Sequence, residues 1–249
     1  MSATPRAAPV PSGHRPRLSR VTLLQRDLAV FDLETTGVDV RTARIVTACI
    51  AVLDPTGALV SRRDWLADPG VEIPEGAAAI HGITTERARA EGRPAAEVVG
   101  EIVAELRAQL AAGLPLVVYN APYDLSLLRF EAERHGVAPL VDPAPVIDPL
   151  VIDKAVDRYR KGKRTLEFAA AHYGVALDGA HDAGVDAIAA GHVARAMVEA
   201  HAAKVPATLD ELHTQQAVWH EQQASNFEDY MRRERDQHFT ADRGWPVRD

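Results

Sequence analysis

An apolar run that ends in two acids one residue apart, in segment 30–37, constrains the fold of this chain most. Side chains alternate between the faces of a β-strand, so Asp32 and Glu34 share one face while Phe31 and Leu33 point into the opposite layer. Two carboxylates on one face repel each other unless a cation lies between them. Mg²⁺ and Mn²⁺ prefer such oxygen ligands, so the pair indicates a divalent-metal site, although for an isolated pair a solvated strand end would be the favoured interpretation.

Matching acids recur downstream, which favours the metal site over the solvated strand end. Asp124 ends the segment 117–124, and His181 stands five residues before Asp186. These segments together resemble the three exonuclease motifs of the DEDDh family, which includes the epsilon proofreading subunit of bacterial replicative DNA polymerases. The resemblance extends from about Leu28 to about Ala200. A sister group of that family has tyrosine in place of the histidine, but no tyrosine stands four residues before Asp186.

The resemblance implies an α/β, ribonuclease-H-like fold with a mixed central β-sheet flanked by helices. It also implies a metal-dependent 3′→5′ exonuclease that acts on single-stranded 3′ ends, with DNA favoured, and releases nucleoside monophosphates. Two Mg²⁺ (or Mn²⁺) ions are then expected as cofactors. Their ligands would be Asp32, Glu34, Asp124 and Asp186, with His181 as the general base that takes a proton from the attacking water.

Six further residues are candidates for substrate binding. The turn of Thr35, Thr36 and Gly37 follows the first acids and suits either the terminal nucleotide or simple turn chemistry. Asn120 suits either a helix cap, which we prefer, or a substrate contact. The remaining two candidates would stack against the last base: Ile80 and His81.

Hydrophobic periodicity and turn residues predict an alternation of strands and helices. Strands are expected at 28–34, 44–53, 58–66, 116–119 and 146–148, and helices at 94–112, 122–135, 165–173 and 183–203. Segment 69–92 is expected to be a loop with one short helix at 75–80. Asp182 is a plausible cap of the last core helix. In one continuous helix His181 and Asp186 would diverge around the axis, so His181 must lie in the loop before the helix, and Gly179-Ala180 permits such a break. Asp148 is expected to have a structural role, and the basic group of Lys161, Lys163 and Arg164 is read as a solvated surface run.

Composition divides the chain into three parts. Residues 1–26 hold arginine, proline and serine but no acid, and we expect a disordered tail. Residues 27–203 form the expected exonuclease domain, and 204–249 form a helical extension. Its apolar stripe should pack on the core or against a second subunit, and it does not resemble the polymerase-binding extension of the epsilon subunit. The stripe comprises Leu209, Leu212, Trp219, Phe227 and Tyr230.

Charge and cysteine content limit the other classes of function. The net charge of −7 argues against a non-specific nucleic-acid coat protein. The single cysteine, Cys49, rules out an internal disulfide and a thiolate zinc site, which fits a reducing cytoplasm. No apolar run is long enough to cross a bilayer, so no membrane partner is expected.

Three alternatives remain open. The same five residues would serve an exoribonuclease of the oligoribonuclease or RNase T type. A non-catalytic module that binds nucleic acid or a polymerase is less favoured, because such modules typically lack one or more of the ligands. A protein-interaction scaffold that depends on the C-terminal helix is favoured least. Single-stranded DNA 3′ ends are therefore the expected partner, with RNA or a DNA polymerase subunit as further candidates.

Overall fold

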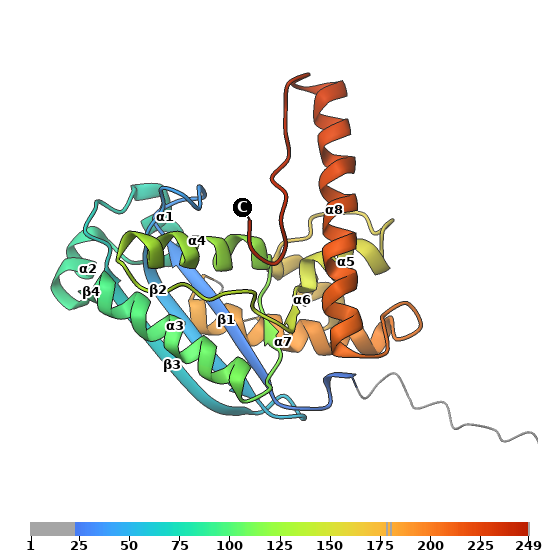
Figure 1. The fold of residues 1–249 in the computed structure, drawn as a ribbon, viewed down its shortest axis with the longest axis horizontal. Helices are drawn as coiled ribbons and strands as arrows, with labels where there is room; N and C mark the ends of the chain where they lie inside the picture. Colours follow the sequence, from blue (N-terminus) through green and yellow to red (C-terminus); the bar gives the residue numbers. More distant parts are fainter. Residues whose placement is uncertain (1–22, 178, 180, 249) are drawn as a thin grey trace, which may run out of the picture.

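The computed structural model describes residues 23–177, 179 and 181–248, and a mixed six-stranded sheet lies at its centre (Figure 1). Its strand order is β4-β3-β2-β1-β5-β6. Neighbours β1–β2 and β2–β3 are antiparallel, whereas β1–β5, β5–β6 and β3–β4 are parallel. The predicted α/β class with a mixed sheet is confirmed. The strands are β1 (Leu28–Thr35), β2 (Ile45–Leu53), β3 (Leu59–Asp68), β4 (Arg93–Pro94), β5 (Leu116–Val117) and β6 (Val146–Ile147).

The helices cover both faces of this sheet. They are α1 (Glu75–His81), α2 (Thr85–Glu91), α3 (Ala95–Ala111), α4 (Ala121–Arg134), α5 (Pro149–Val156), α6 (Leu166–Tyr173), α7 (Ala183–Ala200) and α8 (Leu209–Glu234). Two of them were not predicted. Helix α2 lies in the expected loop 69–92, where the Thr84 hydroxyl caps it by accepting from the Arg87 N–H. Helix α5 begins at Pro149 after the cap Asp148 and spans only eight residues, too few for a clear helical period.

Alternation along β1 directs its side chains into two core clusters, one on each face of the sheet. Phe31 and Leu33 pack with the apolar residues of α3 and α4, whereas Val30 packs with α7 on the opposite face. By the same alternation, Asp32 and Glu34 share a face, as predicted, and this face is the α7 side. Helix α7 approaches the sheet closely because it carries Gly191 there, where an added Cβ would lie 2.6–2.8 Å from side-chain atoms of Leu53 and Val30.

The C-terminal extension packs back onto the sheet. Gln216 of α8 is fully buried, accepts from the Asp148 N–H at 2.6 Å and donates to the Val146 carbonyl at 2.9 Å. The chain then runs back beside α8 toward α4, where the Arg248 N–H donates to Ser126 Oγ at 2.8 Å (Figure 1). The predicted apolar stripe divides: its first part, with Leu212, is buried against the core, whereas Phe227 and Tyr230 are exposed.

At the other end of the chain, Leu23 and Leu24 are buried against the core although they fall inside the predicted tail 1–26. Residues 1–22 of that predicted tail lie outside the described residues. Among the helices of the described part, none is long and apolar enough to cross a membrane.

Candidate active site

Four predicted acids meet at the carboxyl end of β1. Asp32 and Glu34 come from the strand itself, where they stand opposite Cys49 and Thr47 of β2. Asp124 lies in the first turn of α4, and its Oδ1 accepts from the Leu33 N–H at 3.1 Å, which fixes it beside the strand. The fourth, Asp186, lies in the first turn of α7. Strand alternation and two helix starts therefore bring together carboxylates that are far apart in sequence.

His181 lies in the loop before α7, as its five-residue spacing from Asp186 requires. Its backbone is left-handed, with φ of 70°, and its N–H donates to Asp186 Oδ2 at 3.1 Å. Asp182 caps the helix by accepting from the N–H groups of Gly184 and Val185, so the predicted cap is confirmed. Of the two residues proposed to allow this break, Gly179 has φ of 86° and Ala180 lies outside the described residues.

One side-chain ligand atom from each of Glu34, His181 and Asp186 can be chosen so that all three lie within 4.8 Å of one another. His181 Nε2 also lies 3.8 Å from Glu167 Oε1, and both side chains are about half exposed. The imidazole therefore stands at the open edge of the acid cluster, where solvent reaches it.

The crowding of acids disfavours their charged forms. Burial raises the pKa of Asp32 well above its usual value, and the charges of Asp124 and Glu34 raise it further. Burial also raises the pKa of Asp124 well above its usual value, although hydrogen bonds, including one from the Leu33 N–H, oppose this. The pKa of Glu34 rises to about 7 through burial and then the charge of Asp186, whose own pKa is raised by burial.

A divalent cation would relieve this repulsion, and the donor set fits one. The donors are carboxylate oxygens, which suit Mg²⁺ or Mn²⁺ better than a soft metal. Asp186 Oδ1 is buried and has no hydrogen-bond partner among the described residues, as expected of an atom that awaits a ligand. The cluster thus has both the charge and the vacant donor atom that a metal site needs.

The start of α4 corrects the preferred role of Asn120. Asn120 occupies the N-cap position with φ of 67°, but its side chain makes no capping hydrogen bond. Instead Asp148 accepts from the N–H groups of Asn120 and Ala121, each at 3.0 Å, and also caps α5 by accepting from Leu150. Burial raises the pKa of Asp148 to about 6. Asp148 therefore has the structural role expected of it and holds in place the turn that presents Asp124.

The threonine hydroxyl groups of the turn after β1 form hydrogen bonds within the protein. Thr35 Oγ1 lies 2.5 Å from the Tyr123 hydroxyl, which donates to the Gly37 carbonyl at 2.5 Å. Thr36 Oγ1 accepts from the Arg44 N–H at 2.9 Å. These contacts support the turn-chemistry interpretation for the side chains. Tyr123 was missed by the sequence reasoning, although its position directly before Asp124 was a usable signal.

Ile80 and His81 lie on α1 near this end of the sheet. Ile80 is 57% exposed, and α1 has no buried residue. His81 Nδ1 accepts from the Ile83 N–H, while its Nε2 is buried without a hydrogen-bond partner in the described part of the chain. His81 shares a cavity with His181, which places α1 beside the acid cluster.

Cations line a cavity together with two of the acids. A cavity of about 580 Å³ is lined by Asp32 and Asp124 and also by Lys154, Lys163 and Arg164. Arg164 is not a simple surface residue, because it donates to the buried Asp153 carboxylate at 2.6 Å, whereas Lys163 is exposed as predicted. Sequence reasoning missed Lys154, because it lies on the unpredicted helix α5.

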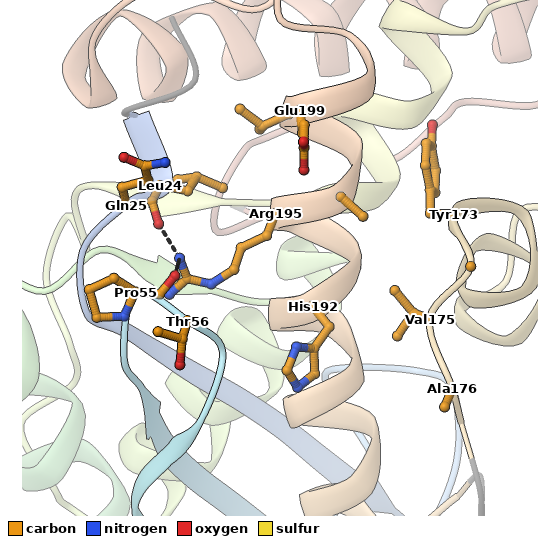
Figure 2. A pocket seen from close by; sticks show the side chains of 13 residues that line it. Leu24, Gln25, Pro55, Thr56, Tyr173, Val175, Ala176, His192, Arg195 and Glu199 are labelled. Atoms are coloured by element: carbon orange, nitrogen blue, oxygen red, sulfur yellow. Dashed lines mark hydrogen bonds between the residues drawn. The ribbon is translucent and has the colours of Figure 1, made fainter. Parts of the chain in front are cut away.

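A separate cavity of about 590 Å³ lies beside the C-terminal half of α7 and holds none of the candidate site residues (Figure 2). Arg195 points from α7 toward the entry to β1 and donates to the carbonyls of Leu24, Arg26, Asp54 and Pro55. Its guanidinium is thus committed to tying the chain before β1 to the turn between β2 and β3. We therefore assign this cavity a structural role and not a role in the candidate active site.

Sequence comparison assigns the chain to a family. The sequence model of the exonuclease family of RNase T type matches residues 29–194, and the chain belongs to that family of hydrolases. It is 31% identical to the PolC-type DNA polymerase III of Lacticaseibacillus paracasei over 76% of this chain and 13% of that protein. It is 34% identical to an epsilon-like DNA polymerase III subunit of Rhodobacter capsulatus, over 47% of this chain and 16% of that protein. The chain thus spans only about an eighth of the PolC-type relatives that it matches.

Solved structures confirm the ribonuclease-H-like exonuclease fold. Exonuclease I of E. coli, in complex with a dA16 oligonucleotide, matches with a TM-score of 0.62 at 19% identity, over 79% of this chain and 44% of that one. The zinc-bound form of E. coli exonuclease I with single-stranded DNA matches with a TM-score of 0.61 at 21% identity, over 72% and 41% of the two chains. The family model ends at residue 194, so α8 lies beyond it.

Proposed function

We propose that this chain is a metal-dependent 3′→5′ exonuclease that hydrolyses single-stranded DNA ends and releases nucleoside monophosphates. The observation that carries the proposal is the convergence of Asp32, Glu34, Asp124 and Asp186 at the end of β1, with His181 at their open edge. All four carboxyl groups have raised pKa values, so each favours a cation nearby.

The four carboxylates would hold two Mg²⁺ or Mn²⁺ ions. Bound divalent metal supplies an activated water, neutralises charge on the phosphate and supports the leaving 3′ oxygen. Among the protein groups, the Leu33 N–H fixes Asp124 Oδ1, and Asp182 fixes the start of the helix that carries Asp186. Both interactions are present without substrate, so they would hold Asp124 and Asp186 in place before substrate binds.

His181 would take the proton from the attacking water. Histidine is the side chain that most often serves as a general acid or base in enzymes. Its solvent-exposed position and the preference of Mg²⁺ for oxygen donors favour a general base over a metal ligand. The backbone contact between the His181 N–H and Asp186 Oδ2 would hold the base next to the metal ligands.

The terminal nucleotide would lie between the β1 turn and α1. Backbone groups of Thr35, Thr36 and Gly37 would face it, since the threonine hydroxyls are engaged within the protein. The exposed Ile80 side chain would stack on the last base, with His81 beside it and Asn120 near the sugar.

The similar proteins favour DNA as the substrate. Their names refer to DNA polymerase III, and the matching exonuclease I structures contain single-stranded DNA. The same names make a DNA polymerase subunit a candidate partner. The deciding experiment is digestion of matched DNA and RNA oligomers by the purified protein with Mg²⁺. Faster loss of DNA from the 3′ end supports the proposal, and faster loss of RNA would establish the exoribonuclease alternative.

A further inference from the structure

A second cavity continues the candidate active site toward the C-terminal helix. It has a volume of about 550 Å³, lies between α5 and α8, and shares the lining residues Lys154 and Arg164 with the cavity that holds Asp32 and Asp124. The two cavities therefore have Lys154 and Arg164 as common wall residues. We call the second cavity the α5–α8 groove, and its side chains that matter here are Lys154, Arg158, Trp219, Gln222, Asn226 and Phe227.

Cations without acidic partners line this route. Lys154, Arg158 and Lys163 are all exposed, and none forms an ion pair with another described residue. In contrast, Arg160 and Arg164 are held by the buried Asp153 carboxylate. A local excess of unpaired cations in a chain of net charge −7 creates a site that attracts phosphate.

The wall contributed by α8 offers aromatic faces and amides. Phe227 is 51% exposed, Trp219 is partly exposed, and Gln222 and Asn226 are exposed between them on the same helix. Gln223 donates to the Val151 carbonyl at 2.9 Å, which fixes α8 against α5, its neighbour in Figure 1. A groove that combines cations with aromatic faces is typical of surfaces that bind single-stranded nucleic acid.

We propose that the α5–α8 groove binds the nucleotides that precede the terminal one in a single-stranded substrate. The inference rests on the proposed function for the position of the 3′ end, and extends it to a helix that lies beyond the family match. Lys154 and Lys163 would contact phosphates next to the scissile bond, and Phe227 and Trp219 would stack on bases further along. The protein would then prefer oligonucleotides long enough to reach α8.

Binding is tested without cleavage, in the Asp32→Asn background, with 5′-labelled dT12. Phe227→Ala should weaken binding roughly fivefold or more, the effect of losing one stacked base. Lys154→Ala should lower the slope of log affinity against log salt by about 0.7, the effect of losing one phosphate contact. The matched controls are Tyr230→Ala, an exposed aromatic on the same helix, and Lys161→Ala, an exposed cation. Neither lines the two cavities, and both should leave affinity unchanged.

Turnover separates this inference from the proposed function. In the active protein, the ratio of kcat/KM for dT12 to that for the dinucleotide dT2 should exceed one and fall toward one in Phe227→Ala. If the wild type cleaves neither substrate, the proposed function fails, and dT12 binding alone decides on the groove. If Phe227→Ala leaves both this ratio and the dT12 affinity unchanged, the proposed role of the groove in binding DNA is wrong. A change of oligomeric state in Phe227→Ala without loss of dT12 affinity overturns it too and identifies a protein interface.

Discussion

At the scale of single residues, the assignment of His181 is the easiest to test. His181→Ala should lower kcat by roughly 10²–10⁴, the usual contribution of a general base, with little change in metal affinity. Raising the pH should restore part of the lost rate, because hydroxide replaces the missing base. The control His238→Ala alters an exposed histidine of the C-terminal segment and should keep full activity. Unchanged kinetics in His181→Ala would show that this histidine is structural.

The crowded acids predict how the stability of the metal-free protein depends on pH. The pKa of Glu34 is raised from 4.5 to about 7 in the folded state, so the folded protein binds more protons than the unfolded chain between those values. The contribution of Glu34 to the free energy of unfolding should therefore fall as pH rises from about 4.5 to 7, by at most about 1.4 kcal/mol per pH unit. Urea melts in chelator across this range, with Glu34→Gln showing a shallower slope, would test this. The same slope in the wild type and in Glu34→Gln would contradict the burial of the Glu34 charge at the site.

Much of the site could be predicted at this scale. Asp32 and Glu34 share a face because strand alternation is fixed, and His181 must leave the helix because a five-residue spacing on α7 would turn it away from Asp186. Asn120 was misjudged because its capping role is taken over by Asp148, a residue distant in sequence. Only the three-dimensional structure shows that Asp148 serves in place of the Asn120 side chain.

At the scale of elements, α8 supports the sheet edge that presents α4. Gln216 satisfies both the Asp148 N–H and the Val146 carbonyl in a buried environment. Gln216→Leu should therefore cost about 1–3 kcal/mol per unsatisfied backbone group, measured by urea denaturation. Gln222→Leu, an exposed position on the same helix, should change stability by less than about 0.5 kcal/mol. Equal losses of stability in Gln216→Leu and Gln222→Leu would contradict this supporting role of α8.

Deleting the chain after His201 removes this support but none of the proposed metal ligands. We expect the truncated protein to have a lower melting temperature and to retain some hydrolysis, because every ligand precedes the cut.

Helices α2 and α5 were not predicted from the sequence. Each is too short to show a hydrophobic period, and each depends on a cap and on its neighbours in the fold.

At the scale of the whole molecule, one end of the sheet carries concentrated negative charge and the adjoining helices carry cations. The α/β class and the mixed sheet were predictable from the order of strands and helices. The position of the α5–α8 groove next to the cavity of the acid cluster could not be predicted, because it depends on how α5 packs against α8. The same separation of charge accounts for an acidic protein that would nevertheless bind nucleic acid.

The central claim is that the converging carboxylates form a metal-dependent centre for 3′→5′ hydrolysis. It is tested most directly by incubating 5′-labelled single-stranded DNA with the wild type and with Asp32→Asn, in Mg²⁺, Mn²⁺, Ca²⁺ or chelator, and resolving the products by length. The account predicts a ladder that shortens from the 3′ end with Mg²⁺ or Mn²⁺. It predicts little cleavage with Ca²⁺ and none with chelator or in the correctly folded variant. Cleavage that persists in chelator, or near wild-type turnover by Asp32→Asn, would contradict it.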